Sequence, residues 1–554
     1  MMQKSKRKKG FTLLEILLVI AAIGILAAIV LVAINPNKQI ESARAAKRKS
    51  DINTIIKSIG QYAIDNNGQY PGGIDTGARV ICPTTSPPVG CVDLSLLSPD
   101  YIANIPEPDT GYYYIRRNSA GTSIEVTHPK DSIWNIGGTP SLDLNFASNK
   151  SLIDNASGNN LITFTRASTG THIGEDGLIK TAAINEPRFD HNPITKESLG
   201  LLVEESRTNL ATRSEEFQLA WTLASSNISQ NTIIGPDGNQ SADGVIANTV
   251  NTSHWIEINP TGFTTATNTT SSIFVKQGLG SAARLLVYGT GNAMHGVIFN
   301  FSTGVATFTN TAEYTSGGGV TTSWGAQDYG NGWWRLWVSG YPDTAATNRR
   351  FRILLSNESN VTSFAGDNAS SYVHVWGAQL ETGVFPTSYI PTTGSSVIRN
   401  ADNGTISGTN FTSTVSNTSI GSFFIQGRGG LESTQNGYGR FIGFNGGGVA
   451  ISRELLNTRI GIWDGSISTQ VSNPSANVVA NISKIGASFN STTRNVALNG
   501  ITSMGVSGVN IGSVFNQIAL GRNGNNSNYL NGVLSRVVFF SNELSTTTLQ
   551  ALTQ

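Results

Sequence analysis

The chain has 554 residues, a net charge of +1 and only 13% charged residues, against about 25% in an average soluble protein. Its length predicts three or four domains, and the near-zero net charge excludes a protein that attracts nucleic acid through a global electrostatic field. Beyond the first fifty residues, glycine, serine, threonine and asparagine dominate. This composition is typical of an extracellular, β-rich protein.

The first predicted element is a long apolar helix behind a cluster of lysines and arginines. Residues 11–34 are apolar apart from small residues, a threonine and Glu15, and they are long enough to span the roughly 30 Å hydrocarbon core of a bilayer. The basic cluster places residues 1–10 in the cytoplasm and the chain after Ile34 outside. A cleavable secretory signal is the alternative. However, apolar residues continue at helical spacing, so we predict one helix over 11–68, ended by Gly68.

The segment KKGFTLLEILLVIAAIGILAAI resembles the N-terminus of type IV pilins and type II secretion pseudopilins. The resemblance implies that a prepilin peptidase removes residues 1–10 as a leader by cutting after Gly10, and that the new N-terminal Phe11 is N-methylated. Glu15 then stands at the fifth mature position.

Glu15 needs a partner, because an unpaired carboxylate within a bilayer is strongly unfavourable. In the resembling family this partner is the α-amine of Phe11 on a neighbouring subunit, so both charges are neutralised only in the assembled filament. A permanent membrane anchor with a stray glutamate is the alternative.

A basic segment, ARAAKRKSD at residues 43–51, follows the apolar run. Lipid headgroups or contacts between helices satisfy these side chains better than DNA does, because they lie one or two turns beyond the membrane. Nucleic acid is therefore not an expected partner.

Residues 69–138 resemble the small head of a pseudopilin, with a helical turn, a proline-marked loop and a β-hairpin. Cys82 and Cys91 lie in the proline-rich loop ICPTTSPPVGC, and the upstream export signal favours a local disulfide over two free thiols. Major pseudopilins often bind calcium near here, and Glu107 and Asp109 are the only local carboxylates that could serve. The family's fuller aspartate pattern is absent, so no metal or other cofactor is expected, with calcium as the alternative.

Beyond residue 138, short apolar or alternating runs are separated by turn residues, a pattern typical of β-sandwiches. No fixed-period repeat is present, which disfavours a solenoid or propeller. We predict a leading β segment at 139–212 and two further blocks at 213–400 and 401–554. The predicted fold is thus an α+β N-terminal pilin, with a long N-terminal helix plus a small β head, followed by mostly-β tandem β-sandwich domains.

Two resemblances describe these blocks. Residues 213–400 resemble carbohydrate-binding jelly-roll modules of phage tail appendages and bacterial surface proteins, through GNGWWRLWVS and WGAQLETGVFPTSYIPTTG. In this pattern Glu381 and Tyr389 are expected to close the sandwich. Residues 401–554 resemble laminin-G or concanavalin-like lectin domains, with a tight turn at Asn499-Gly500 and a final helix capped by Ser545.

No catalytic constellation is apparent in the sequence. The six histidines lack metal-ligand spacing, and neither a nucleophile elbow nor a phosphate loop occurs. Adjacent carboxylates in a strand point to opposite faces, so Glu204-Glu205 and Glu215-Glu216 do not flank one glycosidic bond. The chain is therefore predicted not to be an enzyme, although carboxylates from separate strands could still converge.

Tryptophans provide the best candidates for ligand binding. Sugars stack their apolar faces on exposed aromatic rings, and the candidates are Trp255, Trp333, Trp334 and Trp463. Trp333 and Trp334 are adjacent in a predicted strand and therefore face opposite sides of the sheet. Core packing is the alternative for each of them.

These observations predict a type IV pilin-like filament subunit, minor or at the tip, that displays β-sandwich modules for adhesion to a glycan or cell surface. The subunit would be a single-pass inner-membrane protein with its C-terminus outside, and later part of a surface pilus. Its partners would be the prepilin peptidase, the membrane, other pilin subunits and an extracellular glycan. The alternatives are a pseudopilin of a type II secretion-like system and a surface polysaccharide-cleaving enzyme.

Overall fold

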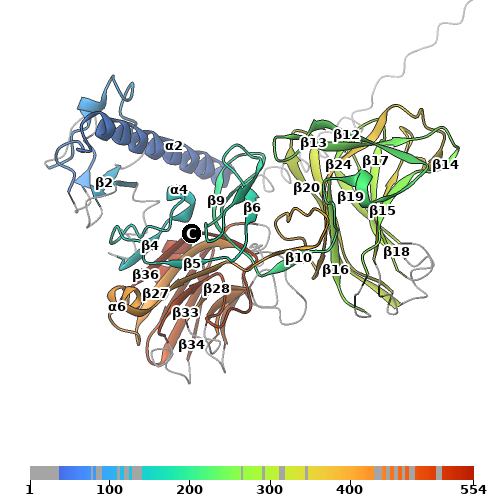
Figure 1. Ribbon diagram of the computed structural model, residues 1–554. Helices are drawn as coiled ribbons and strands as arrows, with labels where there is room; N and C mark the ends of the chain where they lie inside the picture. The colour runs from blue at the N-terminus through green and yellow to red at the C-terminus, as the bar shows by residue number, and fades with distance from the viewer. Residues whose placement is uncertain are drawn as a thin grey trace, which may run out of the picture. The chain divides into compact units, whose positions relative to one another are not determined.

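The computed structural model divides the chain into two compact units, Met1–Asn135 and Ile136–Gln554 (Figure 1). The described residues begin at Pro36, and none of their helices is both long and apolar enough to cross a bilayer. The structure describes residues 36–554 except 76–78, 83–89, 109–112, 118–123, 128–139, 262, 264–265, 290–293, 311–317, 344–346, 348, 430–438, 445–449, 454–458, 464–467, 473–480 and 507–514.

The first unit is built on helix α2 (Pro36–Asp65), the described part of the long helix predicted over 11–68. Ile55 and Ile59, one helical turn apart, are buried against the head. As predicted, the helix ends before Gly68, which has a φ of +80° and donates its N–H to the Ala63 carbonyl. A residue without a Cβ reaches this left-handed conformation at little cost, so glycine ends the helix here.

A small antiparallel sheet and a disulfide complete this head. The sheet has the order β1–β2–β3, and the predicted hairpin pairs Ile115 with Val126. The predicted disulfide is confirmed, since Cys82 and Cys91 are bonded. The elements are β1 (Arg79–Val80), the short 3-10 helix η1 (Ser95–Leu97), β2 (Tyr114–Arg117) and β3 (Ile124–Thr127).

The second unit contains a sandwich of two six-stranded sheets, which we call the inserted sandwich. Alternate residues of each strand face a shared apolar core, as in β21, where Leu336 and Val338 point inward. One sheet has the order β11 (Thr222–Ala224), β15 (Trp255–Ile258), β22 (Arg350–Leu355), β17 (Ala282–Tyr288), β18 (Met294–Asn300) and β19 (Val305–Asn310). The other has the order β12 (Ser226–Ile234), β13 (Gln240–Ala247), β24 (Ser371–Thr382), β16 (Thr269–Gln277), β21 (Trp333–Asp343) and β20 (Gly318–Gly330).

A second sandwich, the host sandwich, has its own apolar core. Its seven-stranded sheet has the order β31 (Ser468–Ser472), β30 (Arg459–Trp463), β29 (Ala450–Arg453), β28 (Arg440–Gly443), β35 (Ile518–Leu520), β26 (Asn403–Ile406) and β5 (Thr163–Thr165). Its eight-stranded sheet has the order β34 (Ile501–Val506), β33 (Thr493–Leu498), β32 (Ser483–Phe489), β27 (Gly421–Arg428), β36 (Gly532–Phe540), β9 (Ser198–Val203) and β8 (Phe189–His191), and β4 (Leu142–Leu144) also pairs with β36.

Several short strands and helices lie outside the large sheets of the two sandwiches. The hairpin of β6 and β7 belongs to neither large sheet, and β14 pairs only with β23. The remaining elements are α4 (Phe146–Asn149), β6 (Gly170–Ile173), β7 (Ile179–Ala182), α5 (Phe217–Ala220), β14 (Thr252–Ser253), β23 (Ser363–Phe364), α6 (Gly408–Thr414) and α7 (Thr546–Thr553).

The chain enters the host sandwich twice. Strands β4, β5, β8 and β9, from the predicted leading segment 139–212, hydrogen-bond to β36 and β26 or to each other, within the sheets of the block predicted at 401–554. That segment is therefore part of the last sandwich, and the block predicted at 213–400 lies in an insertion between β9 and β26. The sandwiches do not follow one another in tandem.

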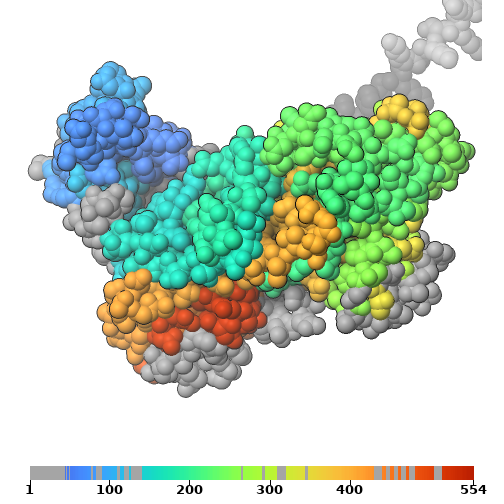
Figure 2. Space-filling model, in the orientation of Figure 1, coloured from blue at the N-terminus to red at the C-terminus, as the bar shows by residue number. Residues whose placement is uncertain are grey.

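The two connections of the insertion run side by side. Strand β10 (Arg207–Asn209) leads into the inserted sandwich, β25 (Val397–Arg399) leads out of it, and the two pair antiparallel. In Figure 2 the orange atoms of the chain around residues 390–400 lie between the teal and green surfaces. The junction is thus a two-stranded ribbon instead of two independent linkers.

Local predictions in the sandwiches are confirmed by the backbone. Asn499 and Gly500 connect β33 to β34 with φ values of 45° and 83°, which is the left-handed pair that a tight hairpin turn requires. Ser545 caps α7 by accepting a hydrogen bond from the Thr548 N–H. Glu381 is fully buried and accepts a hydrogen bond from the Thr387 N–H, so it closes the inserted sandwich as expected.

Candidate binding site between the two sandwiches

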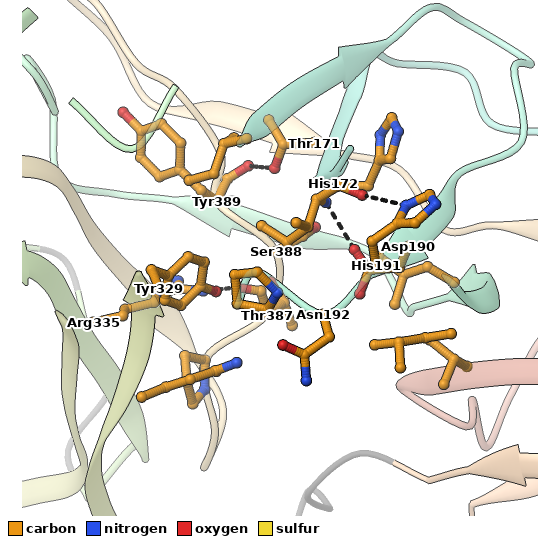
Figure 3. A pocket seen from close by; sticks show the side chains of 18 of the residues that line it. Thr171, His172, Asp190, His191, Asn192, Tyr329, Arg335, Thr387, Ser388 and Tyr389 are labelled. Carbon is orange, nitrogen blue, oxygen red and sulfur yellow. Dashed lines mark hydrogen bonds between the residues drawn. The ribbon is translucent and has the colours of Figure 1, made fainter. Parts of the chain in front are cut away.

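A cavity of about 720 Å³ lies within the second unit, where the insertion meets the segments that flank it (Figure 3). This volume falls in the range of about 300–1,000 Å³ that is usual for small-molecule sites. One wall comes from β6, β8 and the ends of β27 and β36, and the other comes from β20, β21 and the loop after β24. The walls include Thr171, His172, Asp190, His191, Arg428, Tyr329, Arg335, Trp337, Ser388 and Tyr389.

Asp190 is the half-buried carboxylate of the first wall. It precedes an irregularity in the pairing of β8 with β9, and one of its oxygens accepts a hydrogen bond from the Ile173 N–H at 2.8 Å. Burial raises the pKa of Asp190 to about 6, although the Ile173 amide and the nearby Arg428 act in the opposite direction. The protonated acid is therefore well populated in mildly acidic conditions.

Two histidines border this carboxylate. His191 lies on β8, and its Nδ1 is 3.0 Å from the Ile173 carbonyl, which requires Nδ1 to donate. His172 lies on β6, and burial, assisted by nearby Arg188, lowers its pKa to about 4. Neither His191 Nε2 nor His172 Nδ1 has a hydrogen-bond partner among the described residues.

The opposite wall is formed by the outward face of β21. Arg335 donates to the Thr387 carbonyl at 2.7 Å and to Ser272 Oγ at 3.0 Å, and its guanidinium lies 5.3 Å from the centre of the Phe274 ring. Its Nε and the indole Nε1 of Trp337 are buried without an acceptor in the described part of the chain. Buried donors are nearly always paired in folded proteins. These two atoms share their unpaired state with other buried arginine Nε atoms of the described chain, among them those of Arg188 and Arg399.

A buried ion network adjoins the cavity and holds the junction together. Glu204, directly after β9, lies 2.9 Å from Arg188 and 3.5 Å from Arg399. Asp402, directly before β26, is ion-paired with Arg188 and lies 3.0 Å from Arg166. All five side chains are at most 7% exposed. Removing one partner of such a network strands a buried charge, which is strongly destabilising.

The network also links the host sandwich to the insertion. Glu204 accepts hydrogen bonds from the Ser388 N–H at 2.8 Å and from the Ser388 hydroxyl at 2.6 Å. Burial would raise the pKa of Glu204, but Arg399 and Arg188 outweigh it and lower the pKa to about 2. Glu204 therefore stays ionised and keeps the cavity-lining loop in place at neutral pH.

The adjacent candidate tryptophans of β21 do not reach this cavity. Trp333 is only 3% exposed, packs in a cluster with Trp376 and Tyr389, and donates its indole N–H to the Ile234 carbonyl at 3.1 Å. No face of the Trp333 ring is left for a sugar. Trp334 points to the opposite side, as strand alternation predicted. It is partly buried and packs against the core of the inserted sandwich, with its ring centre 4.8 Å from that of Phe299.

The other tryptophan candidates are separate from the cavity. The guanidinium of Arg352 lies 3.8 Å from the centre of the Trp255 ring and is ion-paired with Glu257 at 2.8 Å, so one face of that ring is covered. Trp463 ends β30, and its side chain lies outside the described residues.

The calcium hypothesis rests on two residues of the first unit. The Glu107 carbonyl accepts a hydrogen bond from Lys47 Nζ at 3.2 Å, and Asp109 lies outside the described residues. In the described ranges no three histidine, cysteine, aspartate or glutamate side chains form a group that could hold a metal ion.

Sequence reasoning did not single out Asp190, Arg335, Trp337 or Arg428. A usable signal existed only on β21: in WWRLWVS, strand alternation places Arg335 and Trp337 together on the face opposite to Leu336. Asp190 and Arg428 belong to strands that are far apart in the sequence, and no local pattern connects them.

Comparison with known proteins identifies the first unit. Residues 5–31 match the prokaryotic N-terminal methylation motif. Type II secretion system core protein G of Pectobacterium carotovorum subsp. carotovorum is 32% identical over 135 residues, which are 24% of this chain and 79% of that protein. The protein of the same name from Aeromonas hydrophila is 38% identical over 116 residues, 20% of this chain and 74% of that one.

Among solved structures, domains LG4-5 of the mouse laminin alpha1 chain are similar over 53% of this chain and 85% of that chain, at 11% identity. The TM-score is 0.16, so the sandwich assignment rests on the sheets described above and not on this likeness.

The motif and the relatives place the chain in a class of proteins, the pilin-like subunits with a prepilin-type N-terminus. The chain belongs to the type II secretion system core protein G family. The N-terminal resemblance is thereby confirmed, and Gly10, Phe11 and Glu15 lie inside the matched motif but outside the described residues. Since the longer match spans 135 of 554 residues, family membership does not describe the two sandwiches.

Proposed function

We propose that the protein is a pilin-like filament subunit that is anchored in the membrane by its N-terminal helix before assembly. A prepilin peptidase would cut after Gly10, and the mature helix would then pack against other pilin subunits, with Glu15 pairing with the amine of Phe11. Family membership and the methylation motif at residues 5–31 support this role.

We further propose that the filament displays the two sandwiches for adhesion, and that the cavity between them binds a glycan. The observation that supports this proposal is a 720 Å³ cavity whose walls combine an aromatic ring, Trp337, with hydrogen-bonding groups such as Asp190 and Arg335. Sugar sites need this combination, because the ring covers an apolar sugar face while polar groups bind the hydroxyls. Binding without catalysis is the proposed activity.

A glycan array probed with the full chain in detergent tests this activity. We expect binding that is lost in Trp337→Ala and retained in Trp255→Ala, a matched change at a tryptophan outside the cavity. The absence of any bound glycan would remove the adhesion proposal. Release of new reducing ends from a bound polysaccharide would replace it with an enzymatic function.

A second candidate function is that of a pseudopilin in a secretion machine, which the name of the relatives favours. Shearing cells and probing the released filaments distinguishes the two functions. A surface adhesin is recovered in sheared filaments, whereas a pseudopilin of a secretion machine stays with the cells.

A further inference from the structure

One arginine that lines the cavity, Arg428, has no ion-pair partner among the described residues. Arg428 is the last residue of β27, pairs there with Val533 of β36, and its half-buried side chain lines the cavity. Its guanidinium forms no ion pair with any described residue, whereas the nearby arginines of the junction network are all ion-paired with Glu204 or Asp402. A guanidinium presents five N–H donors in a planar fork that matches a carboxylate.

The unpaired groups of the opposite wall are also donors. Arg335 Nε and Trp337 Nε1 are buried without acceptors among the described residues, and neither atom can accept a hydrogen bond. Both atoms are shielded from solvent, so they add to the donor character of this wall without facing the open cavity. A neutral hydroxyl can accept but is a weaker partner for a guanidinium than an ionised oxygen is.

Three carboxylates line the cavity, those of Asp190, Glu204 and Asp328. Glu204 is ion-paired with Arg188 and Arg399, and Asp328 accepts a hydrogen bond from the Gly330 N–H. Asp190 is the carboxylate on which Arg428 acts. One oxygen of Asp190 accepts a hydrogen bond from the Ile173 N–H, and Arg428 is the cation that lowers the pKa of Asp190 most. When ionised, Asp190 competes with a ligand for Arg428. When protonated, it adds a further donor beside Arg428.

From the position of Arg428 in the cavity, without an ion-pair partner among the described residues, we infer that the cavity selects a saccharide that carries a carboxylate, with Arg428 as the ion-pair partner of that carboxylate and Asp190 as a proton-dependent gate. The inference deepens the proposed glycan binding at the same cavity and rests on it. Arg428 and protonated Asp190 would bind the carboxylate of the saccharide, and Trp337 would cover a face of the sugar ring.

If Asp190 acts in this way, the affinity for an acidic saccharide should increase as the pH falls. The charged or titratable groups around Asp190 come from both walls of the cavity. They are His172 on β6, Arg188 before β8, His191 on β8, Glu204 after β9, Asp328 and Tyr329 on β20, Arg335 on β21 and Arg428 on β27. The arginines stay charged, Glu204 stays ionised because its pKa is about 2, and His172 stays neutral because its pKa is about 4. Tyr329 also stays neutral, because burial raises its pKa further. Asp190, with a pKa of about 6, therefore changes its charge between about pH 5 and pH 7.

Matched pairs of glycans test the inference. The full chain in detergent is applied to an array on which uronic-acid and sialic-acid saccharides stand beside their methyl esters, which keep the shape and remove the charge. We expect binding of acids over their esters by about tenfold or more, because a charge-assisted bond to Arg428 is lost in the ester. The preference should be stronger at about pH 5 than at about pH 7.5.

Four variants separate the roles, with affinities for the best acid measured by calorimetry. Arg428→Gln should lose the preference for acid over ester, whereas Arg459→Gln, a matched change on β30 outside the cavity, should keep it. Asp190→Asn should bind the acid at pH 7.5 as tightly as the wild type does at pH 5, with no remaining pH dependence. His191→Gln should retain the pH dependence. The gain of affinity in Asp190→Asn cannot result from misfolding.

Different results would contradict the two proposals, glycan binding and the selection of a saccharide that carries a carboxylate. Equal binding of acids and esters, or binding of neutral glycans alone, would overturn the carboxylate inference and leave glycan binding intact. A chain that binds no glycan of either kind would overturn both. A pH dependence that persists in Asp190→Asn and disappears in His191→Gln would contradict the assignment of the gate to Asp190.

Discussion

At the scale of single residues, the junction uses buried charge in two opposite ways. Glu204 and Asp402 are neutralised by three arginines, so their ionised forms are stabilised by direct partners. Asp190 accepts only one backbone hydrogen bond in the described structure and has no ion pair within it, so burial dominates its chemistry. The same type of side chain therefore stabilises the junction at two positions and costs stability at a third.

We predict that Asp190→Asn stabilises the protein at neutral pH. The pKa of Asp190 is raised to about 6 in the folded state, so its proton is held more tightly there than in the unfolded chain. The contribution of Asp190 to wild-type stability is therefore most favourable below about pH 4 and decreases as the pH rises through 6, by about 1–3 kcal/mol for a shift of this size. Asparagine accepts the same hydrogen bond without a charge.

The measurement is thermal or urea unfolding of the full chain at several pH values, followed by tryptophan fluorescence. Asp190→Asn and the wild type should have similar stability near pH 4, and the variant should be more stable near pH 7.5. A constant difference across this range would contradict the prediction.

Asp402→Asn should destabilise the second unit strongly. It removes the charge that pairs with Arg166 and Arg188, all three side chains being fully buried, and breaking such a network costs about 3–5 kcal/mol. Asp176→Asn is the matched control, because Asp176 and Lys180 form an ion pair with both side chains more than 40% exposed. Its loss should cost less than about 1 kcal/mol. Equal small effects would show that the network does not hold the junction.

At the scale of elements, the features that depend on neighbouring residues were predictable from the sequence. The end of α2 before Gly68, the Asn499-Gly500 turn and the Ser545 cap each depend on backbone conformations that few residue types adopt. The same holds for the opposite orientations of Trp333 and Trp334, which follow from strand alternation. Which face of β21 meets another part of the protein was not predictable, because it depends on tertiary contacts.

The disulfide of the first unit supports a prediction at this scale. Cys82 and Cys91 close a loop with a sequence separation of 9, and the Cys82 N–H also donates to the Val92 carbonyl at 2.9 Å. Loop closure of this length contributes about 2.5 kcal/mol in the chain-entropy model. The double change Cys82→Ser, Cys91→Ser should therefore increase hydrogen exchange in β2 and β3 and leave the sandwiches unchanged. Faster exchange in both units would contradict an effect confined to the head.

At the scale of the whole molecule, the sequence predicted the sandwiches but not their nesting. Each strand shows its apolar pattern locally, yet the partners of β9 and β4 lie on β36, more than 300 residues later. No signal in a single sequence connects strands at that separation. The binding cavity was missed for the same reason, because Asp190, Arg428 and Arg335 come together only through the insertion.

The nesting predicts that the insertion is removable. Strands β9 and β26 each pair within the host sandwich, and β10 and β25 lie side by side with Arg207 opposite Arg399. A short glycine-serine linker replacing residues 206–398, which keeps Arg399 as a partner of Glu204, should therefore close the chain with little loss of entropy. We expect a folded host sandwich with cooperative unfolding and no glycan binding, since one wall of the cavity is gone. A chain that is unfolded would show that the host sandwich requires the insertion.

The N-terminal motif predicts how the whole molecule reaches its place of action. If Glu15 pairs with the amine of Phe11 on a neighbouring subunit, the charge pair forms only between subunits, and an unpaired carboxylate in the bilayer favours assembly. Glu15→Ala should then leave membrane insertion and cleavage after Gly10 intact but reduce the amount of protein in sheared filaments severely. Glu358→Ala, at an exposed glutamate of the second unit, is the matched control and should assemble normally. Normal entry of Glu15→Ala into filaments would refute the pairing, because filament assembly would then not require the Glu15 carboxylate.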